Sequence, residues 1–399
     1  MSTCRWQIDV ARHIRTIAPQ LWDSILDPED LQASHAFVRT CQESCDAQTP
    51  FWFLTIQKGP DLVCCAVFFA MEVSLDLLAP RWTRRVVRCA RRWTPSLMKL
   101  PVLFCGLPVS FGRSCLRFRP GAPAAELIRI VDATMQQIAH EQKIDLVCLK
   151  EFDEHENTQL SCLTQRAYFV APSLPACTLP LRWKSFDQYV AAMRADYRRQ
   201  VMQTLQCRDA ADWRLHQTNC FQHHIPRMFE LYARVMDRAD HQLERLTLLF
   251  FESFFVHMRA HAHVLLIEHG EILKAFALIL KGPKVSTFLL TGFDEIDFGP
   301  AQLYPNLVLF VIQDAIESGA EQLEMGQTSY LLKTRLGGVL SSRTIYLRSR
   351  SGWRNRLLKT ATPMLFPKTV TPPRRVFRES QRTPGPWTPT AQGDHPLVG

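Results

Sequence analysis

Residues 292–338 read GFDEIDFGPAQLYPNLVLFVIQDAIESGAEQLEMGQTSYLLKTRLGG. Pro305 stands where a helix would begin, and Gly319 stands just past its last turn, which is the usual placement of these two residue types around a helix. The apolar residues between them recur on one face. A short strand is expected at 322–325, followed by a polar and basic turn that ends at Gly338. The order of strand end, acidic loop, helix and strand predicts an α/β unit.

This stretch resembles the FemAB/CelD-like branch of the GNAT acyltransferase superfamily, and the resemblance covers about residues 182–348. The shared features are a G-[YF]-D triplet, a proline at a helix start, a small-residue turn, a strand that ends in glycine, an aromatic residue, a lysine and a Leu-Gly pair. In this chain they are Gly292-Phe293-Asp294, Pro305, Gly319, Gly326, Tyr330, Lys333 and Leu336-Gly337. The resemblance implies an α/β (α+β) protein of two GNAT-like lobes, each a mixed, mostly antiparallel sheet flanked by helices.

A weak internal repeat also favours two lobes. Apolar residues at 123–142 recur at helical spacing, and a strand is expected at 144–149, which is the order seen again about 180 residues later. We therefore expect lobes at residues 1–181 and 182–352, with the two strands in corresponding positions. From residue 353 the chain becomes proline-rich and basic, which predicts a short helix and then a disordered tail over 353–399.

Composition favours a cytoplasmic protein without a transmembrane segment. No run reaches the roughly 18 apolar residues that a membrane-spanning helix needs, and charged residues interrupt the N-terminus. The 13 cysteines include no C-x-x-C pair, so we interpret them as buried thiols in a reducing compartment. His261-Ala262-His263 has no cysteine or acidic cluster beside it, so we expect no metal.

The net charge of +9 is unevenly distributed. Residues 77–125 contain no acidic side chain, and we call 81–119 the basic span; its basic residues are Arg81, Arg84, Arg85, Arg88, Arg91, Arg92, Lys99, Arg113, Arg117 and Arg119. Such a span attracts phosphates, so its expected partners are tRNA, CoA or an anionic membrane surface. Residues 81–93 would form a basic amphipathic helix with tryptophan near each end. The alternatives are a solvated helix face without a partner for the basic span, and an apolar stripe of 81–93 that packs on the domain core.

The resemblance also implies catalytic residues near the strand end. Lys333, with Tyr330 beside it, is expected in the cleft between the lobes, where a lysine can contact a phosphate, a carboxylate or a developing oxyanion. An exposed surface lysine is the alternative. Glu324, Asp294 and Asp297 are candidates for a general base, because an alkylamine with a pKa near 10.4 must lose a proton before it attacks.

Substrate-binding residues are expected on a helix and in a turn. A capping pattern at Ser185 predicts a helix that runs to about Leu205. It carries Arg198 and Arg199, which match a basic F/Y-R-R sequence of the resembled family and are phosphate candidates; solvated helix charges are the alternative. Gln327 and Thr328 could orient a substrate by hydrogen bonds, and turn capping is the alternative role for such residues. Asp294 is also a substrate-binding candidate.

The resemblance implies an N-acyltransferase that moves an acyl group from an acyl-CoA-type donor to an amine acceptor in the cleft between the lobes. The usual R/Q-x-x-G-x-G/A phosphate loop is absent. Its place is taken by 294–299, whose three carboxylates would repel a pyrophosphate. Two alternatives therefore remain: aminoacyl transfer from aminoacyl-tRNA to a cell-envelope acceptor, and a non-catalytic GNAT-like binding module.

Overall fold

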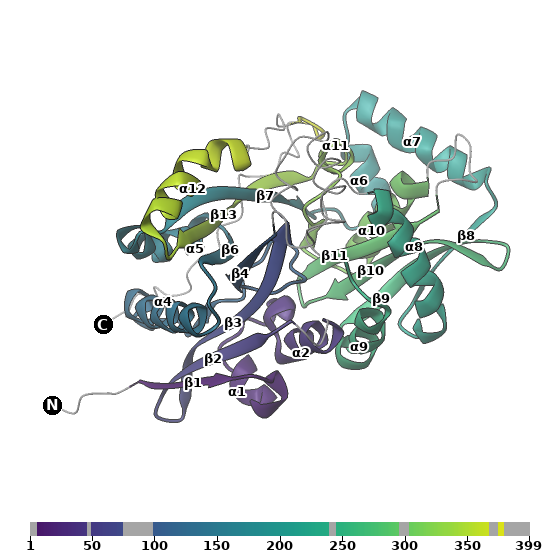
Figure 1. Cartoon of the computed structure of the whole chain (residues 1–399). Helices are drawn as coiled ribbons and strands as arrows, with labels where there is room; N and C mark the ends of the chain where they lie inside the picture. The colour runs from purple at the N-terminus through teal and green to yellow at the C-terminus, as the bar shows by residue number, and fades with distance from the viewer. Residues whose placement is uncertain are drawn as a thin grey trace, which may run out of the picture.

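The computed structural model describes residues 6–45, 49–74, 99–238, 245–294, 303–366 and 374–378. Its strands form one 13-stranded sheet in the order β1-β2-β3-β4-β6-β13-β7-β12-β11-β10-β9-β8, with β5 paired to β3 (Figure 1). The strands are β1 (Gln7–Ala11), β2 (Phe51–Lys58), β3 (Asp61–Ser74), β4 (Lys99–Cys105), β5 (Arg117–Phe118), β6 (Leu146–Phe152), β7 (Phe169–Pro180), β8 (Trp213–Thr218), β9 (Ala262–His269), β10 (Ile272–Lys281), β11 (Val285–Phe293), β12 (Gln322–Glu324) and β13 (Val339–Ser349).

Helices cover both faces of this sheet. The α-helices are α1 (Pro19–Asp23), α2 (His35–Ser44), α4 (Ala124–Glu141), α5 (Glu154–Leu160), α6 (Phe186–Ala192), α7 (Ala195–Asp209), α8 (Ile225–Arg238), α9 (Leu248–Met258), α10 (Leu303–Glu317), α11 (Tyr330–Arg335) and α12 (Gly352–Leu365). Short 3-10 helices lie at η1 (Ile14–Thr16), η2 (Leu31–Ala33), η4 (Ser161–Arg166) and η5 (Gln222–His224). The expected α/β class is thereby confirmed.

The two halves of the sheet repeat one arrangement. In the first, the antiparallel meander β2-β3-β4 leads through α4 to β6, which pairs parallel to β4. In the second, the meander β9-β10-β11 leads through α10 to β12, which pairs parallel to β11. A residue with positive φ follows at the end of each parallel pairing, Glu151 at 71° and Gly326 at 74°. The expectation that β6 and β12 occupy corresponding positions is confirmed.

The next strand of each half crosses to the other half. β7 follows β6 in the chain but pairs antiparallel with β12. β13 follows β12 but pairs antiparallel with β6. β7 and β13 also pair with each other, so the two exchanged strands join the halves into one continuous sheet.

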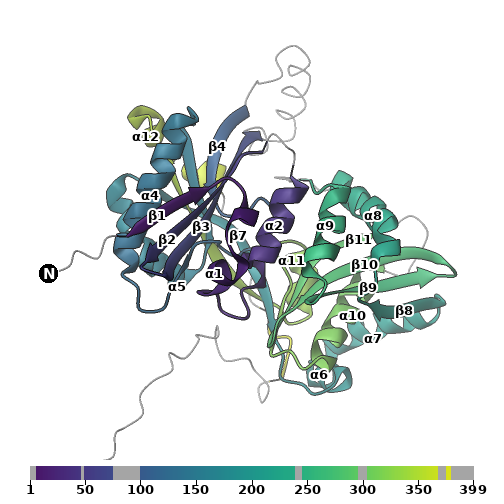
Figure 2. The ribbon, with the colours of Figure 1, turned by 90° about the horizontal axis from the view of Figure 1, so that it is seen from below.

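Side chains of alternate strand residues face different cores, as the pleat of a strand requires. On one face, α1 and α2 of the first half and α8 and α9 of the second share a single core. Figure 2 shows α2 beside α9, and Phe37 meets Phe254 edge-on at 6.3 Å between ring centroids. On the other face the cores are separate: α4 and α5 cover the first half, and α6, α7 and α10 cover the second.

Two expected helix boundaries differ from the structure. The helix expected over 185–205 is broken between α6 and α7, because Met193 is extended (ψ 151°) and forms a β-bridge with Phe377. The described part of α10 begins at Leu303, so Pro305 is its third residue rather than its first. Residues 81–93, Asp297 and most of the expected tail lie outside the described residues. In the part of the chain that the structure describes, no helix is long and apolar enough to cross a membrane.

Candidate functional site

Strands β11 and β12 diverge after a short paired segment. They pair only where residues 285–287 meet residues 322–324, although β11 continues to Phe293. After β12 the chain turns through Gly326 toward β7, where Cys177 donates its backbone N–H to Gly326 at 3.0 Å. Residues 288–293 therefore have no partner among the described strands on this side. We call the wedge between the two strands the fork.

Lys333 lies at the point where the fork opens. Its helix α11 follows Ser329, whose backbone is left-handed (φ 56°), and the side chain is directed inward so that Lys333 is only 3% exposed. The Nζ atom donates a hydrogen bond to the carbonyl of Met325, directly after β12. It also stands 6.0 Å from the centroid of the Phe288 ring, on β11 just past the paired segment. The alternative of an exposed surface lysine is wrong.

The surroundings of Lys333 change its proton affinity. Burial lowers the pKa of Lys333 to about 8, and the neighbouring Cys177 thiol opposes this shift. Burial raises the pKa of Cys177 to about 11, while Lys333 acts in the opposite direction. At pH 7 the fork therefore holds an ammonium beside a protonated thiol. A cation in such an apolar site attracts an anion more strongly than a cation in water does.

Tyr330, Gln327 and Thr328 lie in the turn that carries Lys333. The Tyr330 hydroxyl donates to the Pro175 carbonyl at 2.8 Å, and Gln327 Nε2 donates to the Leu174 carbonyl at 2.7 Å. These bonds hold the turn against β7. Thr328 is exposed. The roles expected of these side chains in substrate binding and catalysis stay predictions.

Glu324 joins the two halves of the molecule. Arg113, from the loop after β4, donates from Nε to the Glu324 carboxylate at 2.9 and 3.2 Å, and Thr287 donates to the same group at 3.1 Å. Arg113 also pairs with Asp30 at 3.3 Å. The sequence placed Arg113 only in the basic span and carried no signal for this pairing.

Asp294 and the α7 arginines lie elsewhere around the second half. Asp294 is buried at the end of β11, where Arg234 pairs with it at 2.7 Å and Arg227 at 3.5 Å. These cations compensate its charge, which weakens the expected repulsion of a phosphate at this residue. Arg198 is half-buried, and Arg199 is exposed and 3.7 Å from Asp196. The described contacts bring neither arginine to Lys333.

The fold is that of two GNAT-like lobes that share one sheet. FemX is similar in structure, with a TM-score of 0.54 and 12% identity over 88% of this chain and 100% of that chain. A conserved protein of unknown function from Bacteroides thetaiotaomicron is also similar, with a TM-score of 0.50 and 9% identity over 86% of this chain and 100% of the other. At these identities the likeness concerns the fold, and it confirms the resemblance to the FemAB-like GNAT branch at that level.

Sequence comparison finds a named relative, which this chain matches over part of its length. No family model matches the chain. A protein named putative 8-amino-7-oxononanoate synthase 2, from two strains of Mycobacterium tuberculosis, is 24% identical over 291 residues. That match covers 72% of this chain but only 37% of the relative. The chain therefore spans little more than a third of the relative's length.

Proposed function

We propose that the protein is an N-acyltransferase that binds its acyl donor in the fork and uses Lys333 to stabilise negative charge on the donor or in the transition state. The observation that carries the proposal is the position of Lys333. It is a buried cation that is hydrogen-bonded to Met325, directly after β12, and lies 6.0 Å from the centroid of the Phe288 ring on β11. A buried lysine away from the fork would not support this reading.

The fork offers a donor both backbone and charge. Residues 288–293 of β11 present peptide groups that no described strand pairs on the β12 side. An extended, amide-containing arm, such as that of an acyl-CoA, could pair with them as an added strand does. The acyl carbonyl would then lie near the end of β12, where Lys333 is held. This supports an acyl-CoA-type donor.

The chemistry that we propose is acyl transfer to an amine. The neutral amine nitrogen attacks the thioester carbonyl carbon, the carbonyl electrons move to oxygen, and the ammonium of Lys333 stabilises that oxyanion. When the carbonyl re-forms, the C–S bond breaks and the thiol leaves as thiolate, which takes up the proton released by the amine. The products are an amide and a free thiol. Glu324 is held by Arg113, so we propose no proton transfer to it.

Two other functions rest on separate features. An aminoacyl-tRNA donor, with a cell-envelope acceptor, would use the basic span for the tRNA phosphates. A non-catalytic binding module would keep the fork and Lys333 as an anion site without turnover. The same single-turnover assay separates all three, because it reports which donor is consumed and whether any product forms.

The test is single-turnover transfer with a panel of acyl-CoAs, aminoacyl-tRNA and amine acceptors, for wild type and Lys333→Met. Loss of one preorganised stabiliser typically lowers the rate on the order of a hundredfold or more, so we expect a loss of that size. Lys284→Met is the matched control, because the Lys284 side chain is 65% exposed. Unchanged turnover in a well-folded Lys333→Met protein would mean that this lysine is not part of the machinery.

A further inference from the structure

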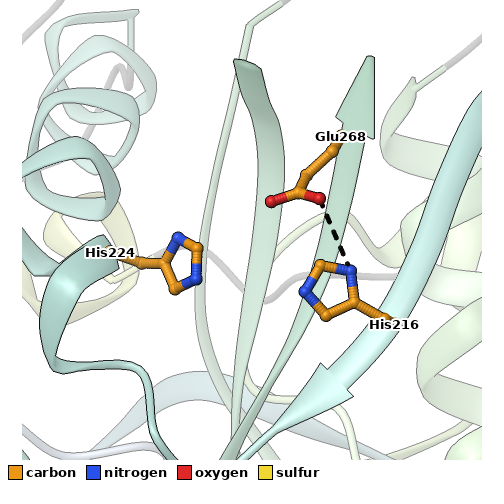
Figure 3. A group of neighbouring side chains, drawn as sticks. All are labelled: His216, His224 and Glu268. Atoms are coloured by element: carbon orange, nitrogen blue, oxygen red, sulfur yellow. Dashed lines mark ion pairs between the residues drawn. The ribbon is translucent and has the colours of Figure 1, made fainter. Parts of the chain in front are cut away.

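Three side chains from different elements converge at the edge of the second half of the sheet. His216 comes from β8, Glu268 from the neighbouring β9, and His224 from η5 (Figure 3). None belongs to the fork, and their spacing along the chain does not group them. His261 and His263, the histidine pair considered in the sequence analysis, are not in this group. His263 is buried, and its Nε2 atom lies 2.9 Å from a carboxylate oxygen of Asp314.

The three residues have the dimensions of a metal site. Each offers one ligand atom, and these atoms all lie within 4.8 Å of one another. His216 Nδ1 is 3.6 Å from a carboxylate oxygen of Glu268. Ligands about 2.0–2.2 Å from a tetrahedral zinc ion are themselves roughly 3.3–3.6 Å apart. The His216–Glu268 separation agrees with this range, and the ligand atom of His224 lies within 4.8 Å of the other two.

The His216–Glu268 spacing is wider than that of two other histidine–carboxylate pairs in the described residues. Two other histidines in this chain approach carboxylates closely, His257 to Glu43 at 2.7 Å and His263 to Asp314 at 2.9 Å. His216 Nδ1 stops at 3.6 Å, beyond hydrogen-bond distance, and this buried atom has no hydrogen-bond partner in the structure. A buried polar atom without a partner calls for an explanation, and an ion between the three groups is one.

The backbone holds the three ligands in place. His216 pairs with Leu266 in the β8–β9 register, so Glu268, two residues further along β9, projects from the same face. Glu268 is fixed from its other side, where it pairs with Leu273 of β10. The short helix that carries His224 follows Phe221, which is fully buried in the shared core.

We propose that His216, His224 and Glu268 bind a zinc-class divalent cation. Two imidazoles and one carboxylate form a ligand set that suits zinc. All three side chains are partly exposed, which leaves the fourth position open to water. The ion links the edge strand β8 and the turn before α8 to β9. Because β8 ends the sheet and has only β9 as a described neighbour, this link stabilises an edge strand.

Zinc content and affinity test the proposal directly. Metal-free full-length protein is dialysed against Zn²⁺, and bound zinc is measured in wild type, His224→Ala and Glu268→Gln. We expect about one ion in wild type and at least about a hundredfold weaker binding in each variant, since losing even an outer-shell partner costs about 10- to 100-fold. His223→Ala is the matched control, because His223 is an exposed neighbour outside the group, and it should bind as wild type does.

Two further measurements separate this site from other zinc ligands and from misfolding. Co²⁺ in place of zinc should give a d–d spectrum without a thiolate-to-cobalt band, because no cysteine belongs to the group. Amide exchange in β8 should slow when zinc is added to wild type but not to His224→Ala, whose metal-free exchange should match that of metal-free wild type. A thiolate band, equal zinc affinity in all four proteins, or no zinc bound to wild type at micromolar concentration would overturn the proposal.

Discussion

Replacing Lys333 with methionine should change how the stability of the protein depends on pH. The folded chain holds the Lys333 proton only up to about pH 8, whereas the ordinary pKa of a lysine is 10.5. Between these values the unfolded chain binds more protons, so the stability of the wild type rises with pH. The methionine variant has no group to titrate there. Its stability should therefore lack this rise.

The size of the effect follows from the two pKa values. A tenfold difference in proton affinity is worth about 1.4 kcal/mol, so keeping Lys333 charged in its buried site costs about 3 kcal/mol below pH 8. Loss of its hydrogen bond to Met325 should offset about 1 kcal/mol of this. The variant should thus be about 2 kcal/mol more stable at pH 7. Its advantage should shrink by about 1 kcal/mol between pH 7 and pH 9.

The assay is equilibrium unfolding in urea at pH 7, 8 and 9, with free energies extrapolated to water. Lys284→Met should give a curve parallel to that of the wild type, because that side chain is mostly exposed. Thiol titration is common to all three proteins and largely cancels in the difference. A stability difference between Lys333→Met and wild type that stays constant or grows from pH 7 to pH 9 would refute a lowered pKa at Lys333.

Two further predictions concern the surroundings of the site, and a third concerns the basic span. Arg113→Gln should destabilise the protein by about 2 kcal/mol in urea unfolding, because Glu324 loses its cation; a change below about 0.5 kcal/mol would contradict this. Gly338→Ala would put a Cβ atom 2.6 Å from Cys177 Sγ, so we expect a loss of about 1–3 kcal/mol together with slower acyl transfer, and wild-type behaviour in both would disprove the close contact. Replacing Arg84, Arg85 and Arg88 by Gln should weaken binding to tRNA, CoA or anionic vesicles, with a smaller loss at high salt; the idea fails if the unmodified protein binds none of them.

The repeated meander, helix and strand could be predicted because each element has its own periodic pattern. The helix at 124–141 and the strand after it show this clearly. The exchange of β7 and β13 could not be predicted in this way, since either strand would show the same pattern beside either neighbour. Met193 is a similar case: the pairing that ends α6 comes from Phe377, which is far away in the sequence.

The residues of the candidate site show the same difference between local patterns and long-range pairing. Lys333 and Tyr330 were candidates because of the family resemblance and their spacing of three residues, and the structure places both on the helix α11. Glu324 was a candidate from the sequence, whereas its partner Arg113, which comes from the other half of the chain, was not. The zinc ligands are a stronger example, because His224 and Glu268 meet only after the sheet has formed. Local patterns identify residue types, whereas long-range pairing decides which of them meet.

The exchange of β7 and β13 delays strand pairing during translation. When β6 leaves the ribosome, the neighbour that will cover its open edge is still about 200 residues away, at β13. At roughly 5–20 residues per second, that edge waits about 10–40 s for its partner. β7 is made soon after β6, but its own final neighbour β12 is also made late. The first half of the nascent chain therefore carries an unpaired strand edge until translation reaches residue 349. During that interval we expect the open edge of β6 to be a binding site for a chaperone.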